Sequence, residues 1–273
     1  MIRVTYVSTL CAPSLLNYLF ETAEEKPEQA AQKFHRLLAQ GIGSSDKASI
    51  RTLSTIPITP DNHQRKFWFI KKEISEQVQY SYIPIINLPF LKNLIVFIYT
   101  FLNVCLNNLL WIGHKKVVIC DVLNITASSA ALLACKLTFV KCIGVVTDIP
   151  GLMITNIKED RSALFTYIYK NAASFILKRF SGYIMLTEQM NSVVNPRNRP
   201  YMIMEGLVDK TMKTTANKEV EKYEQFVMLY AGGLYAKYGC LDLINAVKGM
   251  KSPLARLHLY GSGDMVKKMD EYT

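Results

Sequence analysis

The feature that most constrains this chain of 273 residues is a regular alternation of short apolar runs with helix-like segments from Lys116 onward. The runs at 117–122 (VVICDV) and 142–147 (CIGVVT) predict buried strands, and a segment rich in small residues separates them. Strands that alternate with helices are typical of a parallel sheet that is covered by helices on both faces. The sequence therefore predicts an α/β fold.

The same alternation extends toward both ends of the chain. Residues 2–8 (IRVTYVS) predict the first strand, and residues 27–40 predict a helix that Pro27 begins and Gly41 ends. The polar and basic stretch 61–72 predicts a loop. Further strands are expected at 51–58, 183–186 and 201–204, and further helices at 127–137, 161–180 and 188–194.

Residues 94–112 come close to the length and apolarity of a membrane span, which takes roughly 20 residues. Asn103, Asn107 and Asn108 argue against a span, because amides are costly in hydrocarbon. Asn103 and Asn107 also lie one helical turn apart and give the helix a polar edge. We expect a largely buried helix. A helix on a membrane surface is the second alternative, and a membrane span is the third.

The charge balance favours anionic partners. With 32 Lys and Arg residues against 22 Asp and Glu residues, the chain has a formal net charge of +10. This charge attracts nucleotide phosphates, lipid phosphates, an acidic membrane surface or nucleic acid. Nucleic acid is disfavoured, because the basic residues are scattered and the sequence has no helix-turn-helix, zinc-finger or RNA-stacking motif.

The six cysteines and four histidines do not predict a metal site or a disulfide. The cysteines form no C-x-x-C pair and lie mostly in apolar runs, so we expect buried free thiols in a reducing cytoplasm. The histidines are spread along the chain, and His35 and His63 are expected on the surface or on a helix face, without a catalytic role. No cleavage pattern follows Met1, so no signal peptide is predicted.

A glycine turn follows the apolar run at 226–230 and leads into a segment with helical spacing. The turn contains Gly232 and Gly233, and Lys237 lies just beyond them. A strand that leads through a glycine turn to a helix N-terminus brings backbone N–H groups close to a phosphate. With Lys237 as an added cation, this arrangement suits a nucleotide diphosphate.

A second glycine turn, at Gly261 and Gly263, follows the next apolar run. Two successive turns favour a phosphate site, although glycines in such turns also occur where the backbone needs a positive φ and no ligand is involved. By contrast, residues 9–14 contain no glycine after the first predicted strand. A dinucleotide-binding fold requires G-x-G-x-x-G at that point, so an NAD- or FAD-dependent enzyme is disfavoured.

The segments LYAGGLYAKYGCLDLINAV and LHLYGSGD resemble the opening of the donor-binding domain in family-4 glycosyltransferases of the GT-B fold. Bacterial enzymes of capsular and exopolysaccharide biosynthesis are the most similar in style, and the KFHRLL helix near the N-terminus also resembles them. Many relatives have an Arg and a Lys around the first glycine turn. In this chain Gly233 and Tyr238 stand there, with Lys237 beside them.

The resemblance implies a GT-B-like α/β architecture: a Rossmann-like acceptor-side domain at 1–208 and the start of a second Rossmann-like domain, for the donor, at 226–273. Residues 209–225 are polar and nearly free of large aliphatic side chains, which indicates a linker. A donor domain needs a sheet of several parallel strands, and the two strands predicted here cannot form one alone. In the relatives, the chain continues beyond this point and includes a Glu-x7-Glu pair that binds the donor sugar. We therefore expect the chain to be C-terminally truncated.

The implied activity is the transfer of a hexosyl group from a UDP- or GDP-sugar to a lipid-linked oligosaccharide, with no metal and no other cofactor. The resemblance gives the donor diphosphate a binding set in the two glycine turns: Gly232, Gly233, Lys237, Gly261 and Gly263. The resemblance implies a cytoplasmic localisation, with possible peripheral contact to the anionic inner face of the cell membrane. It implies no contact with nucleic acid.

On the acceptor side, Asp148 follows a buried strand and is the candidate catalytic residue, as a base or as an anchor for the acceptor hydroxyl. The alternative is that Asp148 caps the next turn. Asp121 is expected to be a turn residue. Glu205 and Gly206 close the N-terminal domain and are expected to act as a hinge at the cleft.

Two other functions stay open at this point. The chain could be a catalytically inactive glycosyltransferase remnant that acts as a binding scaffold, or an unrelated nucleotide-binding α/β enzyme. A phosphate bound at the turn after the first strand, in place of the Gly232 turn, would favour the unrelated enzyme.

Overall fold

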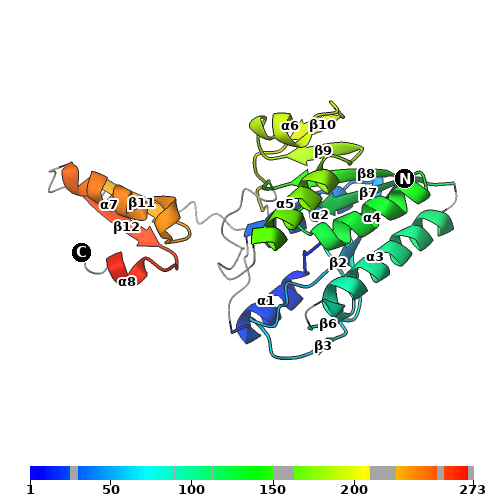
Figure 1. Ribbon diagram of the computed structural model, residues 1–273, viewed down its shortest axis with the longest axis horizontal. Helices are drawn as coiled ribbons and strands as arrows, with labels where there is room; N and C mark the ends of the chain where they lie inside the picture. The colour runs from blue at the N-terminus through cyan, green and yellow to red at the C-terminus, as the bar shows by residue number, and fades with distance from the viewer. Residues whose placement is uncertain are drawn as a thin grey trace. The chain divides into compact units, whose positions relative to one another are not determined.

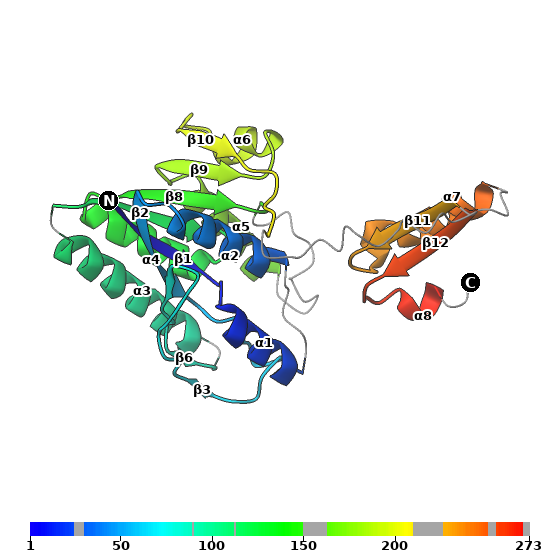
Figure 2. The same ribbon diagram turned by 180° about the vertical axis from the view of Figure 1, so that it is seen from behind.

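The computed structural model describes residues 1–24, 30–88, 90–111, 113–149, 163–209, 226–250 and 255–269. The chain divides into two compact units, Met1–Lys210 and Thr211–Thr273, and each unit is described by itself. Figures 1 and 2 show the elements of both units from opposite sides.

An eight-stranded sheet forms the centre of the first unit. Its strands in spatial order are β10 (Tyr201–Ile203), β9 (Gly182–Met185), β8 (Lys141–Val146), β7 (Lys115–Asp121), β1 (Ile2–Ser8), β2 (Ala48–Ser54), β5 (Val78–Tyr80) and β4 (Glu73–Ser75). All neighbouring strands in it are parallel except β4 and β5. The predicted α/β fold with a parallel sheet is confirmed, and the first predicted strand coincides with β1.

Helices cover both faces of this sheet, as Figures 1 and 2 show. One face packs against α1 (Pro13–Thr22) and α2 (Ala30–Gly43). The other face packs against α3 (Leu91–Leu110), α4 (Ile125–Leu137), α5 (Ala163–Leu177) and α6 (Gln189–Val194). A short antiparallel pair, β3 (Phe67–Trp68) and β6 (Ile85–Ile86), lies outside the main sheet.

The alternation of side chains along β1 divides the core into these two layers. Val4 and Tyr6 are buried on the α1–α2 side, and Val7 is buried on the α3–α4 side. This two-sided burial is the reason that the strands read as continuous apolar runs. The chain leaves β1 toward β2 on one side and places β7 on the other, so the strand order reverses at β1. In sheets of this kind, ligands bind beyond the carboxyl ends of the strands at such a reversal.

The second unit contains a two-stranded parallel sheet in its described part, formed by β11 (Phe226–Ala231) and β12 (Ala255–Tyr260). The 3-10 turn η2 (Ala236–Tyr238) and helix α7 (Cys240–Gly249) connect the two strands, and α8 (Val266–Met269) follows β12. A small core holds these elements together; its buried members are Leu234, Cys240, Ile244, Met265 and Met269. The predicted order of strand, glycine turn, helix and second strand is confirmed.

Helix α3 is less buried than we expected from the sequence. Among the described residues it is the one helix that is long and apolar enough to cross a membrane, judged by length and composition alone. Only 28% of its most apolar 18-residue window is buried. The expectation of a largely buried helix was wrong because the outward face of α3 is as apolar as the face that packs on the sheet.

Other local predictions also need correction. His63 was expected on the surface or on a helix face, but it is buried in a loop. His35 lies on helix α2, as one of its two expected positions allowed, and its side chain is buried. The stretch 61–72 is not all loop, because it contains β3 and its buried Trp68. Helix α2 continues to Gly43, beyond the predicted end at Gly41, and helix α1 was not predicted. Pro27 lies outside the described residues.

Candidate functional site

A row of polar residues lines the carboxyl edge of the first unit's sheet, where the strand order reverses. Ser8 ends β1 and pairs in register with Ser54 at the end of β2. On the other side of β1, Asp121 ends β7 and pairs with Val145 of β8, three positions before Asp148. The topology therefore brings polar groups from four neighbouring strands to one edge.

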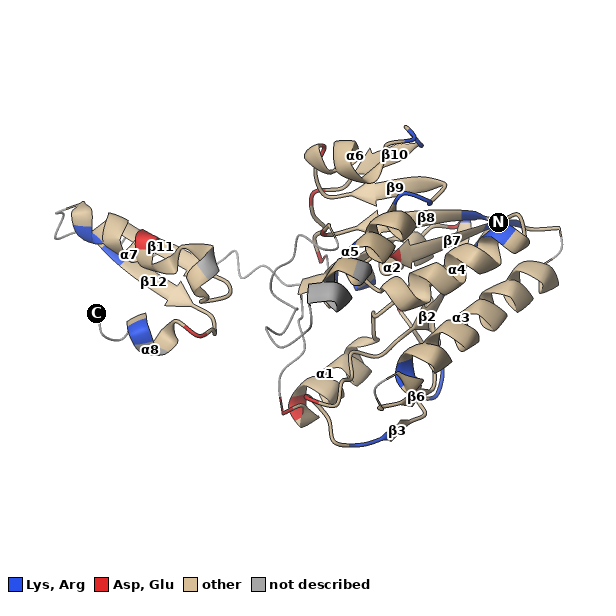
Figure 3. Cartoon of the chain, in the orientation of Figure 1, with Lys and Arg blue, Asp and Glu red and all other residues tan. Residues whose placement is uncertain are grey.

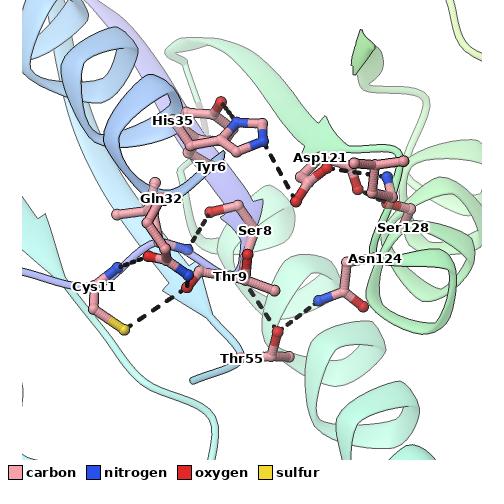
Figure 4. A network of polar contacts seen from close by, with 12 residues as sticks. Tyr6, Ser8, Thr9, Cys11, Gln32, His35, Thr55, Asp121, Asn124 and Ser128 are labelled. Atoms are coloured by element: carbon pink, nitrogen blue, oxygen red, sulfur yellow. Dashed lines mark hydrogen bonds and ion pairs between the residues drawn. The ribbon is translucent and has the colours of Figure 1, made fainter. Parts of the chain in front are cut away.

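Three buried side chains behind this edge form a polar cluster, shown in Figure 4: Tyr6 of β1, His35 of α2 and Asp121 of β7. The hydroxyl of Tyr6 lies 2.6 Å from Nδ1 of His35. Nε2 of His35 lies 3.4 Å from Oδ2 of Asp121, although the alignment is too poor for a hydrogen bond. The contact between these two groups is therefore electrostatic.

Burial and the nearby carboxylate keep the tyrosine of this cluster protonated. Burial first, and then the charge of Asp121, raise the pKa of Tyr6 well above its usual value. Tyr6 therefore keeps its proton, and its hydroxyl shares a hydrogen bond with Nδ1 of His35. The other oxygen of Asp121, Oδ1, accepts from the backbone N–H of Leu123 at 3.0 Å.

Three successive backbone amides of the loop after β1 are bonded within the protein. The backbone N–H of Leu10 donates to Ser8 Oγ at 3.1 Å, that of Cys11 to Gln32 Oε1 at 3.0 Å, and that of Ala12 to the Tyr82 hydroxyl at 3.2 Å. In a phosphate-binding turn, such amides point at the ligand. This occupancy agrees with the lack of glycine in residues 9–14 and speaks against a phosphate site at this turn.

The turn from β7 into α4 is also fixed by side chains. Asn124 caps α4, because its Oδ1 accepts from the N–H of Ala127 at 3.3 Å. Its Nδ2 donates to Thr55 Oγ1 at 2.5 Å, across to the loop after β2. Ser128 Oγ donates to the carbonyl of Asp121 at 2.5 Å. These bonds hold Asp121 in place at the turn, which agrees with its expected role as a turn residue.

Asp148 is the half-buried carboxylate at the end of the neighbouring strand β8. Its Oδ1 accepts from the N–H of the next residue, Ile149, at 2.7 Å. The two carboxylate oxygens of Asp148 have further lone pairs that can accept a hydrogen bond from a ligand hydroxyl. A role in catalysis stays a prediction. The loop that begins at Pro150 lies outside the described residues.

Glu205 and Gly206 follow β10 and are exposed. A methyl group on Gly206 would meet no heavy atom within 4 Å, so packing does not demand a glycine there. The hinge role predicted for these two residues stays a prediction.

In the second unit, the two glycine turns are joined to each other by backbone hydrogen bonds. The N–H of Gly232 donates to the carbonyl of Tyr260 at 2.9 Å, and that of Leu234 to the carbonyl of Ser262 at 2.9 Å. The N–H of Met265 donates back to the carbonyl of Leu234 at 3.1 Å. The Gly232 amide is thus not free for a phosphate.

Close approach of these backbones explains two of the glycines. A Cβ on Gly261, which has a φ of +156°, would lie 1.8 Å from the carbonyl oxygen of Gly232. A Cβ on Gly263 would lie 2.1 Å from the carbonyl oxygen of Leu234. The structure therefore gives a steric reason for Gly261 and Gly263 that needs no ligand.

Gly233 lies where the chain leaves β11 for η2, and α7 begins after Gly239, a residue in the left-handed region with φ of 68°. A Cβ on Gly233 would lie 2.9 Å from ring atoms of both Tyr235 and Tyr238. The side chain of Lys237 lies outside the described part of the structure. Donor binding by these residues stays a prediction, and within the described residues no group of three or more His, Cys, Asp or Glu side chains could hold a metal ion.

Sequence reasoning missed most of the polar cluster. Tyr6 reads as an apolar strand residue, and His35 reads as the polar side of an amphipathic helix. Their contacts are with residues far along the chain, so neither periodicity nor spacing gives a signal for them. The one available hint was the position of Asp121 at the end of an apolar strand.

Comparison with solved structures gives the fold class: the chain has the α/β arrangement of the GT-B type. The crystal structure of HepE (Alr3699) from Anabaena in complex with UDP is similar with a TM-score of 0.52 at 12% identity, over 99% of this chain and 65% of that one. The structure of OtsA without ligand is similar with a TM-score of 0.52 at 9% identity, over 99% of this chain and 68% of that one.

The chain thus spans 65% of the length of HepE, and at this identity the likeness concerns the fold. No protein-family model matches the chain, and a search of the curated proteins finds no match either.

Proposed function

We propose that this chain is part of a glycosyltransferase that uses a nucleotide-sugar donor. The observation that carries the proposal is the structural likeness over 99% of the chain to a GT-B protein that was crystallised with UDP. The likeness includes the strand–glycine turn–helix unit from β11 to α7, where the sequence predicts a diphosphate site. A nucleotide diphosphate is a leaving group that backbone amides and a cation stabilise without a metal.

In this proposal each of the two units binds one of the two substrates. The first unit binds the acceptor at the carboxyl edge of its sheet, where Asp148 orients the acceptor hydroxyl or accepts its proton. Asp121 lies next to it but is buried and bonded to Leu123, so it supports the edge and does not touch substrate. The second unit binds the UDP or GDP part of the donor through Gly233 and Lys237, and the chemistry needs no metal.

For the acceptor we propose a lipid-linked oligosaccharide in the synthesis of a bacterial surface polysaccharide such as a capsule, with a hexosyl group transferred at the cytoplasmic face of the membrane. The net charge of +10 supports an acceptor that carries phosphate groups. The exposed apolar face of α3 supports contact with a lipid phase.

A transfer assay tests this proposal. The chain is incubated with radiolabelled UDP- and GDP-sugars and a polyprenyl-diphosphate-linked oligosaccharide, and labelled lipid product is measured. We expect transfer from one donor, and we expect Asp148→Asn to lower the rate by about 100-fold or more, the usual share of a general base. Transfer from no donor by a folded protein would overturn the proposed activity.

A second candidate is a scaffold that binds acceptor or partner without catalysis. It is favoured by the sheet of the second unit, where one face, including Leu229, His258 and Tyr260, is exposed. A doubly wound donor domain covers both faces of its sheet with helices. Nucleotide binding separates the two candidates, because the scaffold binds neither UDP nor GDP.

A further inference from the structure

The outward face of α3 carries a continuous row of large apolar side chains. Their spacing is three to four residues, so they share one side of the helix. Their exposed fractions lie between 47% and 73%, and the residues are Leu94, Ile98, Leu102, Leu106, Leu109 and Leu110. Exposure of this many apolar side chains in one row marks a surface that contacts a partner or a membrane.

Helix α4 extends the row sideways. It packs beside α3 on the same face of the sheet, and Asn108 Nδ2 of α3 donates to Thr138 Oγ1 at the end of α4 at 2.8 Å. Leu133 and Leu137 of α4 are exposed, and Phe139 just beyond it is 96% exposed. We call the six residues of α3 together with these three the α3–α4 face.

Neither of the two helices carries an acidic side chain. The sequence has no Asp or Glu between Glu76 and Asp121, and none between Asp121 and Asp148. Lys136 lies on α4 beside Leu137, and exposed lysines begin the strands that follow the two helices, Lys115 and Lys141. Figure 3 shows α3 and α4 almost free of charge, with basic residues at the starts of β7 and β8.

The inner side of α3 is fixed to the rest of the unit by polar bonds. Arg51 of β2 donates to Oδ1 of both Asn103 and Asn107, and the guanidinium lies 3.0 Å from the Asn107 oxygen. Lys116 of β7 donates to the carbonyl of Asn108. A membrane-spanning α3 would break these bonds and leave Arg51 without its partners. These bonds therefore favour an α3 that stays part of the folded unit.

We propose that the α3–α4 face is a docking surface for a membrane that contains anionic lipid. The leucines, Ile98 and Phe139 enter the boundary between headgroups and acyl chains, and the lysines at the rim pair with lipid phosphates. The absence of acidic residues from both helices argues for a lipid surface as the occupant. The α3–α4 face is thus the surface through which the membrane contact of the proposed function would occur. Membrane binding by this face does not require that the protein transfers sugar.

Vesicle co-sedimentation tests the inference. The protein is mixed with vesicles of phosphatidylcholine alone, or of phosphatidylcholine with phosphatidylglycerol, at low and at high salt. We expect binding to the anionic vesicles that weakens at least several-fold in high salt, because lipid charge and lysine charge attract each other. We expect the double variant Leu102→Glu/Leu106→Glu to lower the bound fraction at least tenfold.

Two controls accompany this variant. Ile74→Glu places the same charge on an exposed apolar residue of β4, which is 79% exposed and outside the α3–α4 face, and it should bind vesicles like the wild type. Circular dichroism of all proteins shows that they are folded, which is expected because the changed side chains point to solvent. Charge reversal of the rim, Lys136→Glu/Lys141→Glu, should lower anionic binding and leave the fold intact.

Three results would overturn the inference. The first is equal vesicle binding by the wild type and the Leu102→Glu/Leu106→Glu variant. The second is a dimer in light scattering that this variant converts to a monomer, because a second copy would then cover the face. The third is membrane protein that resists extraction by alkaline carbonate, as a true span does. A protein that binds vesicles but transfers no sugar leaves this inference standing and overturns the proposed activity.

Discussion

Tyr6, His35 and Asp121 show how single residues shape the candidate site without being part of its surface. All three are buried, and they link β1, α2 and β7 just behind the carboxyl edge of the sheet. A buried network of this kind is stable when each polar group has its partner and costly when one is removed. We therefore interpret the cluster as support for the position of Asp121 and its turn.

Replacement of Tyr6 by Phe tests this interpretation. The change removes the hydroxyl and leaves Nδ1 of His35 buried without its partner at 2.6 Å. We expect the free energy of unfolding to fall by about 1–3 kcal/mol, the usual cost of an unpaired buried polar group. Denaturant unfolding measures it, with Tyr18→Phe on the exposed side of α1 as a control that changes little. Equal stability of the two variants would show that the Tyr6–His35 bond does not matter.

Gly261 gives a second prediction at this scale. Gly261→Ala would force its Cβ to 1.8 Å from the Gly232 oxygen, so the two glycine turns must separate. We expect the second unit to lose more than about 3 kcal/mol of stability, as steric overlaps with rigid backbone do. Gly249→Ala is the matched control, because its Cβ meets nothing within 4 Å and Ala favours the helix. Hydrogen exchange of the β11 and β12 amides reports the difference; equal protection in both variants would contradict the close packing of the turns.

Among the elements, strands in long apolar runs were easiest to predict; the short strands β3 to β6 were not predicted, and the burial of α3 was predicted wrongly. Strand β1 agrees with its predicted range, and β8 is shifted from its prediction by one residue, because an apolar run bounded by polar residues identifies a buried strand. Helix α3 was predicted at nearly the right place, but its burial was not. Leu102 and Val104 are equally apolar in the sequence, and only the packing on β2 and β7 decides that Val104 is buried and Leu102 is exposed.

Asn107 fixes α3 to the sheet and leads to a prediction for this element. Asn107→Ala removes one acceptor of Arg51, whose pKa is lowered chiefly by its burial. We expect the free energy of unfolding to fall by about 1.5–3 kcal/mol, because the lost bond involves a charged group. Asn93→Ala, at an exposed position in the first turn of α3, should stay within about 0.5 kcal/mol of the wild type. An equally mild effect of Asn107→Ala would show that Arg51 does not hold α3 in place.

Lys92 makes the stability of α3 dependent on pH. Its ammonium donates to the carbonyl of Ile58, and burial lowers the pKa of Lys92 to about 8 from 10.5. Between these pH values the folded chain releases a proton that the unfolded chain keeps. The free energy of unfolding should therefore rise with pH in this interval, by at most about 1.4 kcal/mol per pH unit.

The change Lys92→Met isolates this contribution, because buried thiols and phenols with raised pKa, such as Cys11, act in the opposite direction above about pH 9. The quantity to follow is the difference in unfolding free energy between wild type and Lys92→Met from pH 7 to pH 10. As the pH rises, the unfolding free energy of the wild type should increase relative to that of Lys92→Met. A constant difference would mean that Lys92 keeps its usual pKa.

For the molecule as a whole, the sequence indicated the fold class and both candidate sites, but not how the backbone of the second site is used. Alternating strands and helices sufficed for the α/β fold, and Asp148 was predicted as a candidate because it follows a buried strand. The glycine turn after β11 was also found. That the Gly232 amide bonds to Tyr260 could not be predicted, because this bond joins segments that the fold brings together. In the proposed donor site, the diphosphate would therefore be bound by the amides around Gly233 and by Lys237.

Equilibrium binding of nucleotides tests the central claim, that the β11–α7 turn holds the diphosphate of a sugar donor, most directly. The chain is titrated with UDP and with GDP in a calorimeter, alongside Gly261→Ala and the control Gly249→Ala. We predict that one of the two nucleotides binds the wild type and Gly249→Ala at one site, and binds Gly261→Ala at least tenfold more weakly. A folded wild-type chain that binds neither nucleotide, or a Gly261→Ala variant that binds as well as the wild type, would contradict the account.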